Sequence, residues 1–141
     1  MKATKLRRIL VPIDFSLPSL ATLRFAKLLA ARFGAKLHLV HIVAPIPIYS
    51  LGPGVLLPPF PDKAIMQAAK KRLQELVSQF SLPEGETRCT VRLGEASAQI
   101  NDVAGQSCAD LIAIATRGLT GLKHAFLGST TQRVVRAASC P

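Results

Sequence analysis

Short apolar runs alternate with segments of helical periodicity along this chain, and this alternation constrains its fold more than any other feature. The runs lie at residues 7–14, 36–43 and 111–115 and are mostly apolar in their interiors. Strands that are buried on both faces of a parallel sheet have this composition. Residues 87–93 alternate Thr, Cys and Val with Arg, and this pattern predicts a fourth strand.

The first predicted helix follows the first strand directly. Ser16 is suited to cap its start, Pro18 is tolerated in its first turn, and Gly34 is suited to end it. Apolar residues recur inside it at the spacing of an amphipathic stripe that faces a core. These are Ala21, Phe25, Leu28 and Leu29.

Three further helices are predicted, at residues 62–80, 97–107 and 129–138. In the first of them we expect Asp62 to cap the start, with Ile65, Ala69, Leu73 and Leu76 on the core side. Its basic residues, Lys63, Lys70, Lys71 and Arg72, are expected to point mostly to solvent. The helix at residues 97–107 is expected to pack through Ile100, Val103 and Ala104.

The order of these elements predicts an α/β fold. A chain that alternates strand and helix forms a parallel sheet with right-handed crossovers and helices on both faces. Because the chain has 141 residues and no internal repeat, we expect one three-layer domain spanning residues 1–141. Residues 44–62 carry six of the ten prolines and are predicted to form a long loop, which either covers a site or has no such role.

Residues 116–131 are the best candidate for a ligand site. This run follows a strand and leads directly into a helix, with glycines at Gly118 and Gly128 and hydroxyls at Ser129 and Thr130. Glycine can adopt positive φ or allow close approach of a ligand, and the free amides at a helix N-terminus bind phosphate oxygens. An ordinary connection with turn glycines and a capping serine is the alternative.

Three stretches of the chain resemble the universal stress protein family. They are ILVPIDFS at residues 9–16, LVHI at residues 39–42, and TRGLTGLKHAFLGST at residues 116–130. ATP-binding members carry a glycine, two residues, a second glycine, nine residues, and then Gly-Ser or Gly-Thr. Gly118, Gly128 and Ser129 match this spacing, whereas Ala115 stands in place of the first glycine.

The resemblance implies a nucleotide-binding fold, similar to the adenine nucleotide alpha hydrolases, that holds ATP with Mg²⁺ or Mn²⁺ bound through the triphosphate. It places Asp14 near the adenine and ribose, Ile42 against the adenine, and Gly118, Gly128, Ser129 and Thr130 at the phosphates. The complete predicted ATP site consists of Pro12, Ile13, Asp14, Ile42, Ile114, Ala115, Arg117, Gly118, Gly128, Ser129 and Thr130. The resemblance also implies a homodimer, although the final edge strand of the family is absent from this sequence, which stops at Pro141.

Composition narrows the classes of partner. The net charge of +10 favours phosphate-bearing ligands, but the basic residues are scattered without interleaved aromatic residues, which does not favour a nucleic-acid site. No apolar run is long enough to span a membrane, and no signal-peptide core follows the basic N-terminus. With three cysteines and no CxxC spacing, we expect reduced thiols in the cytoplasm.

The motifs of common nucleotide-using enzymes are missing from the sequence. There is no Gly-Lys-Ser/Thr ending of a P-loop, and the first strand–helix turn lacks GxGxxG. His38 and His41 should point to opposite faces of their strand, which argues against a shared metal site. We therefore expect no catalytic residues, at most slow ATP hydrolysis, and a sensor or regulatory role in the stress response; the alternative is a stress protein that binds no nucleotide and acts through its dimer or protein partners.

Overall fold

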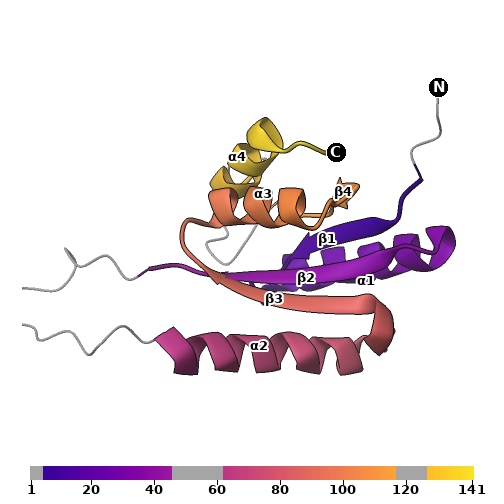
Figure 1. Ribbon diagram of the computed structural model, residues 1–141, viewed down its shortest axis with the longest axis horizontal. Coiled ribbons are helices and arrows are strands. Elements are labelled where there is room, and N and C mark those ends of the chain that lie inside the picture. Colours follow the sequence, from indigo (N-terminus) through magenta and orange to yellow (C-terminus); the bar gives the residue numbers. More distant parts are fainter. Residues whose placement is uncertain (1–4, 46–61, 117–126) are drawn as a thin grey trace, which may run out of the picture.

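A four-stranded parallel sheet forms the centre of the part of the protein that the structure describes. The structure is a computed structural model, and it describes residues 5–45, 62–116 and 127–141. The strands lie in the order β3-β2-β1-β4 (Figure 1). Their bounds are β1 (Arg8–Pro12), β2 (Lys36–Val43), β3 (Thr87–Leu93) and β4 (Leu111–Ile112).

Helices cover both faces of this sheet. The helices α1 (Leu17–Phe33) and α2 (Asp62–Gln79) pack on one face, while α3 (Ala96–Gln106) and α4 (Ser129–Ala137) pack on the other. A short 3-10 helix, η2 (Glu84–Glu86), leads into β3. The predicted α/β fold with a parallel sheet and helices on both faces is confirmed.

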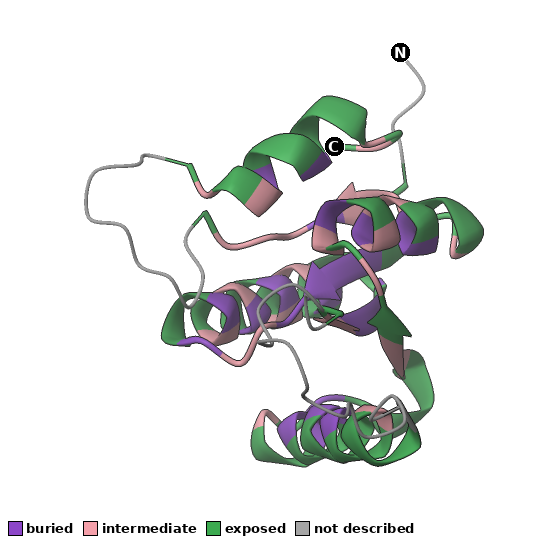
Figure 2. Cartoon of the chain, turned by 90° about the vertical axis from the view of Figure 1, so that its left-hand side faces the viewer, coloured by how far each residue is buried: buried purple, intermediate pink, exposed green. Residues whose placement is uncertain are grey.

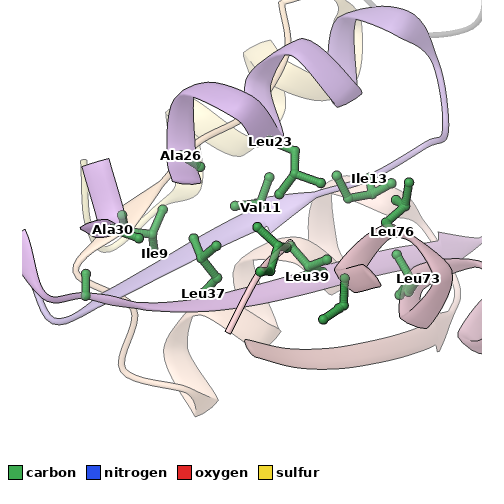
Figure 3. Packing of buried hydrophobic residues seen from close by; sticks show 13 residues of the cluster. Ile9, Val11, Ile13, Leu23, Ala26, Ala30, Leu37, Leu39, Leu73 and Leu76 are labelled. Atoms are coloured by element: carbon green, nitrogen blue, oxygen red, sulfur yellow. The ribbon is translucent and has the colours of Figure 1, made fainter. Parts of the chain in front are cut away.

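The core is divided by the sheet into two apolar clusters. The larger cluster joins alternate residues of β1 and β2 to α1 and α2, and Figure 3 shows Leu23 and Ala26 of α1 directed at Val11 and Ile9. The smaller cluster joins Leu10 and Val40, on the opposite face of the same strands, to α3 and α4. Figure 2 shows buried residues concentrated in the sheet and on the inward sides of the helices.

The predicted buried stripe of α1 is wrong. Leu23, Ala26 and Ala30 are buried, whereas Phe25 and Leu28 are 60% and 68% exposed. Both sets recur at helical spacing, so periodicity alone could not choose between two apolar stripes on an Ala- and Leu-rich helix. Small residues at positions 26 and 30 allow the helix to lie close to the sheet, and this packing decides the orientation.

The ends of α1 agree with the sequence-based prediction. Ser16 is the N-cap and accepts a hydrogen bond from the amide of Ser19 through Oγ. Gly34 ends the helix with φ of +64°, in the left-handed region that favours glycine. In α2 the predicted core residues Ala69, Leu73 and Leu76 are buried, but Ile65 is 42% exposed, because it lies in the first turn beyond the covered part of the sheet.

The strand β4 is shorter than the predicted strand at residues 111–115. Ladder pairing with β1 is confined to Leu111 and Ile112, and one further bond joins the amide of Ala113 to the carbonyl of Leu10. Beyond that point β1 ends, so residues 114 and 115 have no strand beside them on that side. On the other side of β4, the amide of Ile112 donates to the carbonyl of Pro141, so the C-terminal residues lie against this outer edge.

The remaining expectations about the fold concern the termini, the loop and the thiols. Of the proline-rich residues 44–62, those from 46 to 61 lie outside the described residues. Among the helices that are described, none combines the length and apolarity that a membrane crossing requires. Cys89, Cys108 and Cys140 are free thiols.

Candidate functional site

A cavity of about 440 Å³ lies at the carboxyl ends of the strands. It is placed where the strand order reverses, because the chain proceeds from β1 to β2 and β3 on one side and returns to β4 on the other. Ligands of open α/β sheets bind at this position. The lining residues are Pro12, Ile13, Asp14, Ser19, Val40, His41, Ile42, Ala44, Ala96, Ile100, Ile114, Ala115, Gly128, Ser129, Thr130 and Thr131.

Most of the residues predicted for the ATP site line this one cavity. They come from the end of β1, the end of β2, the segment after β4 and the start of α4. The predicted residues found there are Pro12, Ile13, Asp14, Ile42, Ile114, Ala115, Gly128, Ser129 and Thr130. Arg117 and Gly118 lie outside the described residues.

Asp14 lies between β1 and α1 and organises the start of the helix. Its Oδ1 accepts hydrogen bonds from the amide of Ser16, at 3.0 Å, and from the Ser16 hydroxyl. The same hydroxyl oxygen accepts from the amide of Ser19, so Asp14 orients the N-cap of α1. The carboxylate thus has a structural role at the same time as it lines the cavity.

Phe15 holds this turn in place. Its φ of +62° is in the left-handed region, which a bulky residue adopts at a cost of about 1 kcal/mol or more. Its ring lies 4.8 Å from the His41 ring and 3.8 Å from the guanidinium carbon of Arg72, in a cation–π arrangement. These contacts offset the backbone strain and fix the direction in which the chain leaves Asp14.

The end of β2 contributes His41 and Ile42. His41 Nδ1 lies 2.7 Å from the carbonyl oxygen of Ile13, which ties the ends of β1 and β2 together beyond the ladder. His38 instead contacts Thr90 Oγ1 through Nε2, at 2.7 Å, so the two histidines have separate partners. In the described ranges, no group of three His, Cys, Asp or Glu side chains is arranged to hold a metal ion.

The start of α4 corrects the predicted role of Gly128. Its φ is −61°, so it does not use positive φ, and its amide donates to the carbonyl of Thr116 at 2.7 Å. A Cβ at this position would lie 3.1 Å from that carbonyl oxygen. Glycine is therefore needed for close approach to the backbone of Thr116, and the Gly128 amide is already used within the chain.

The amides that follow Gly128 are better placed to bind an anion. Gly128 is the N-cap of α4 and has no side-chain oxygen, so it cannot cap the first-turn amides of Ser129, Thr130 and Thr131 as Ser16 caps α1. These amides lie at the positive end of the helix dipole, and all three residues line the cavity. The start of α4 thus presents a built-in donor set to this space.

Thr131 connects α4 to the segment after β4. Its hydroxyl donates to the carbonyl of Ala115 at 2.7 Å, and the side chain is buried. Ala115 and Gly128 are consequently held on one wall of the cavity by two bonds, the second being the one from Gly128 to Thr116. Ala115 keeps this connection although it replaces the first glycine of the expected motif.

The start of α3 forms a second helix end at the cavity. Glu95 caps it by accepting from the Ala98 amide, at 2.8 Å, and from the Ser97 hydroxyl, at 2.7 Å. These hydrogen bonds, with a smaller contribution from Arg133 at 3.5 Å, lower the pKa of the Glu95 carboxyl below its usual value. Because Glu95 occupies the α3 amides, the start of α3 contributes Ala96 and Ile100 to the cavity as an apolar wall.

Several lining residues were not predicted from the sequence. Ser19, His41, Ala96, Ile100 and Thr131 come from turns of helices and from the same strand end as Ile42. His41 could have been found, because it adjoins Ile42 at the end of a strand. The others depend on how α1, α3 and α4 are placed over the sheet, which no local pattern reports.

Comparisons with known proteins agree with the fold and the site. The family model described as the universal stress protein family matches residues 5–141. Universal stress protein A homolog 2 of Coxiella burnetii is 31% identical over 115 residues, which cover 82% of this chain and 77% of that protein.

Solved structures show the same fold. The universal stress protein UspA from Lactobacillus plantarum superposes with a TM-score of 0.75 at 23% identity, covering 96% of this chain and 94% of that one. A universal stress protein in complex with cAMP superposes with a TM-score of 0.62 at 21% identity, covering 95% of this chain and 91% of that one. The match of the family model over nearly the whole sequence decides the assignment: this chain belongs to the universal stress protein family.

Proposed function

We propose that this protein binds ATP in the cavity at the carboxyl ends of its strands. The observation that carries this proposal is the meeting of the ends of β1 and β2 with the uncapped start of α4 in one cavity of about 440 Å³. A cavity of this volume is within the range of small-molecule sites. The mixture of apolar walls, one carboxylate and helix-terminal amides suits a base, a sugar and phosphates in turn.

Each part of the nucleotide has a matching part of the wall. Val40, Ile42 and Ile100 give an apolar surface on which adenine can lie, and Asp14 can accept a hydrogen bond from a ribose hydroxyl or the adenine amine. The amides of Ser129, Thr130 and Thr131, with their hydroxyls, can donate to phosphate oxygens. The cAMP complex of one structural relative supports an adenine nucleotide as the ligand class.

A divalent cation would be held by the triphosphate and not by a protein cage. Mg²⁺ is commonly bound through phosphates with one carboxylate or none, and it retains several waters. Asp14 is the one carboxylate among the described residues that line the cavity. Mg²⁺ or Mn²⁺ bound in this way would lie among the phosphate oxygens, where Asp14 is the available protein ligand.

The role of the protein is then that of a nucleotide-dependent regulator of the stress response, acting in the cytoplasm as one domain and as a homodimer. Catalysis of rapid turnover would need an activated nucleophile or a positioned general base. The described cavity wall offers Asp14 and His41, and both are bonded to the backbone or hydroxyl groups of the β1 end. ATP hydrolysis is accordingly slow or absent in this proposal.

Calorimetric titration of the protein with ATP and Mg²⁺ tests this function. We expect saturable binding in the micromolar to millimolar range, and no heat of binding at millimolar ATP would refute the proposal. Gly128→Val should abolish the heat, while Gly105→Val, whose added Cβ meets no atom within 4 Å, should retain it. A steady multiple-turnover release of phosphate would replace the regulator with an enzyme.

A second candidate function rests on Ala115. If the first glycine of the motif is needed for a close approach of phosphate to the backbone, the methyl group of Ala115 disfavours nucleotide binding. The protein would then act through its dimer surface or protein partners. ATP binding that appears only in the Ala115→Gly variant would support this candidate.

A further inference from the structure

A second cavity, of about 420 Å³, lies at the opposite end of the sheet, where the strands begin. Its walls include the first residues of β1, β2 and β3 and the last turn of α3. None of the residues at this end belongs to the family's nucleotide motif. This amino-end cavity is therefore separate from the carboxyl-end cavity described above.

Strand register gathers basic side chains in the amino-end cavity. Arg8 of β1 is paired with Lys36 of β2, and two residues further along, His38 of β2 is paired with Arg88 of β3. Residues at alternate positions of a strand share a face, so one face of three adjacent strands presents Arg8, Lys36, His38 and Arg88 together. All four line the cavity, and Glu86 is the one carboxylate among its lining residues.

The positive charges of this cavity are not neutralised within the described parts of the chain. Across residues 5–45, 62–116 and 127–141, the side-chain ion pair within 4.0 Å is that of Arg133 with Glu95, far along the chain from this end. The Arg8 guanidinium is held by the carbonyl of Ser107, to which it donates at 2.9 Å. Arg8 thus has a fixed position with further N–H groups left to bind an acceptor.

His38 forms the floor of the cavity as a neutral ring. It is 8% exposed, and its Nε2 lies 2.7 Å from the Thr90 hydroxyl oxygen. Burial, followed by the charges of Arg88 and Arg92, lowers the pKa of His38 from 6.5 to about 4. The ring is therefore uncharged at neutral pH, and it senses the positive potential of the arginines beside it.

We propose that the amino-end cavity binds a small phosphorylated anion, independently of any nucleotide in the carboxyl-end cavity. Arginine and lysine are the side chains that bind phosphate oxygens most strongly, and three of them from three strands surround a space of small-molecule size. The concave shape fits a compact anion better than the extended backbone of a nucleic acid. The amide of Gln106, which also lines the cavity, supplies a neutral donor for the organic part of such a molecule.

Histidine-resolved NMR of the full chain with labelled imidazoles, titrated with inorganic pyrophosphate, tests the proposal. His38 lines the amino-end cavity and His41 lines the carboxyl-end cavity, so each end has its own reporter. We expect saturable shifts of the His38 signals, assigned with His38→Gln, and a rise in the His38 pKa, because the anion offsets the charges of Arg88 and Arg92. The same His38 shifts should persist in Gly128→Val, which keeps this test separate from ATP binding.

Charge-matched variants complete the experiment. Lys36→Gln with Arg88→Gln should weaken the His38 response at least about tenfold, because two charge-assisted contacts are lost. Arg32→Gln with Lys71→Gln removes the same charge from exposed positions of α1 and α2 and should change it less than about twofold. Absence of a His38 response at millimolar pyrophosphate, or equal weakening in both double variants, would overturn the proposal. A His38 response to duplex DNA but not to pyrophosphate would also overturn it, in favour of a nucleic-acid surface.

Discussion

The two ends of the sheet carry cavities of almost the same volume, about 440 and 420 Å³, but of opposite construction. The described lining of the carboxyl-end cavity has hydroxyls, helix-terminal amides, apolar side chains and one carboxylate, Asp14. The described lining of the amino-end cavity has three cationic side chains around a buried histidine. One end would bind phosphate through fixed backbone dipoles, and the other through side-chain charge.

This difference has physical consequences. Helix-terminal amides are fixed by the fold and depend on the exact approach of one backbone segment to another, so a single added carbon can disturb them. Side-chain cations depend on charge and are screened by salt. Substitutions of small residues should therefore affect the carboxyl end, whereas ionic strength, pH and charge removal should affect the amino end.

The largest effect is expected from Gly128→Val. Its Cβ would press on the Thr116 carbonyl oxygen from 3.1 Å, and the branched side chain would displace the start of α4. We expect ATP affinity to fall at least about thirtyfold, or about 2 kcal/mol, by calorimetry. Retained affinity in a folded Gly128→Val protein would show that the start of α4 does not hold the phosphates.

The next effect concerns pH and the amino end. His38 has a pKa of about 4 in the folded chain and an ordinary value of 6.5 when unfolded. Between these values the unfolded chain takes up a proton that the native chain does not, so the free energy of unfolding falls as the pH drops from 6.5 to 4. We expect the loss to be about 1–2 kcal/mol, after allowance for solvent screening, in urea unfolding.

His38→Gln provides the control for this pH effect. The variant should lack that part of the pH dependence, while the contributions of the carboxyl groups remain in both proteins. Identical slopes for wild type and variant between pH 6.5 and 4 would contradict the burial of a neutral ring at this end.

Asp14→Asn separates the two roles of this side chain. Asparagine keeps an oxygen that can accept from the Ser16 amide but loses the negative charge. We expect stability to change by less than about 0.5 kcal/mol and ATP affinity to fall about fivefold, or about 1 kcal/mol. A clear loss of stability with unchanged affinity would leave Asp14 with its role at the start of α1 alone.

Ala115→Gly is expected to have the smallest effect. Because the Ala115 carbonyl, and not its side chain, accepts the bond from Thr131, the cavity wall should survive the change. We expect ATP affinity to rise about threefold or less, which is about 0.6 kcal/mol. A rise from no detectable binding to tight binding would favour the nucleotide-free function of the natural chain.

The sequence predicts the carboxyl end well because its signals are local. Apolar runs, the Ser16 and Gly34 caps and the spacing from Ala115 to Ser129 are each contained in a short stretch, and strand ends of a parallel sheet meet at one edge. The role of Gly128 was misjudged because its close neighbour, Thr116, is distant from it in the chain. The buried face of α1 was misjudged because Phe25 and Leu23 lie on stripes of similar apolarity.

The amino end could not be predicted in the same way. Arg8, Lys36 and Arg88 belong to three separate strands, and each alone looks like an exposed charge at a strand start. Only the register that pairs Arg8 with Lys36 and His38 with Arg88 brings them together. Sites built from motifs can be found in a sequence, while sites built from strand register require the structure.

The central claim is that ATP binds at the carboxyl end, and histidine-resolved NMR during titration with ATP and Mg²⁺ tests it most directly. The titration is best done in the protein carrying Lys36→Gln and Arg88→Gln, in which anion binding at the amino end is weakened. The account predicts saturable shifts of the His41 signals with His38 unchanged. Unchanged His41 signals at millimolar ATP, or shifts confined to His38, would contradict it.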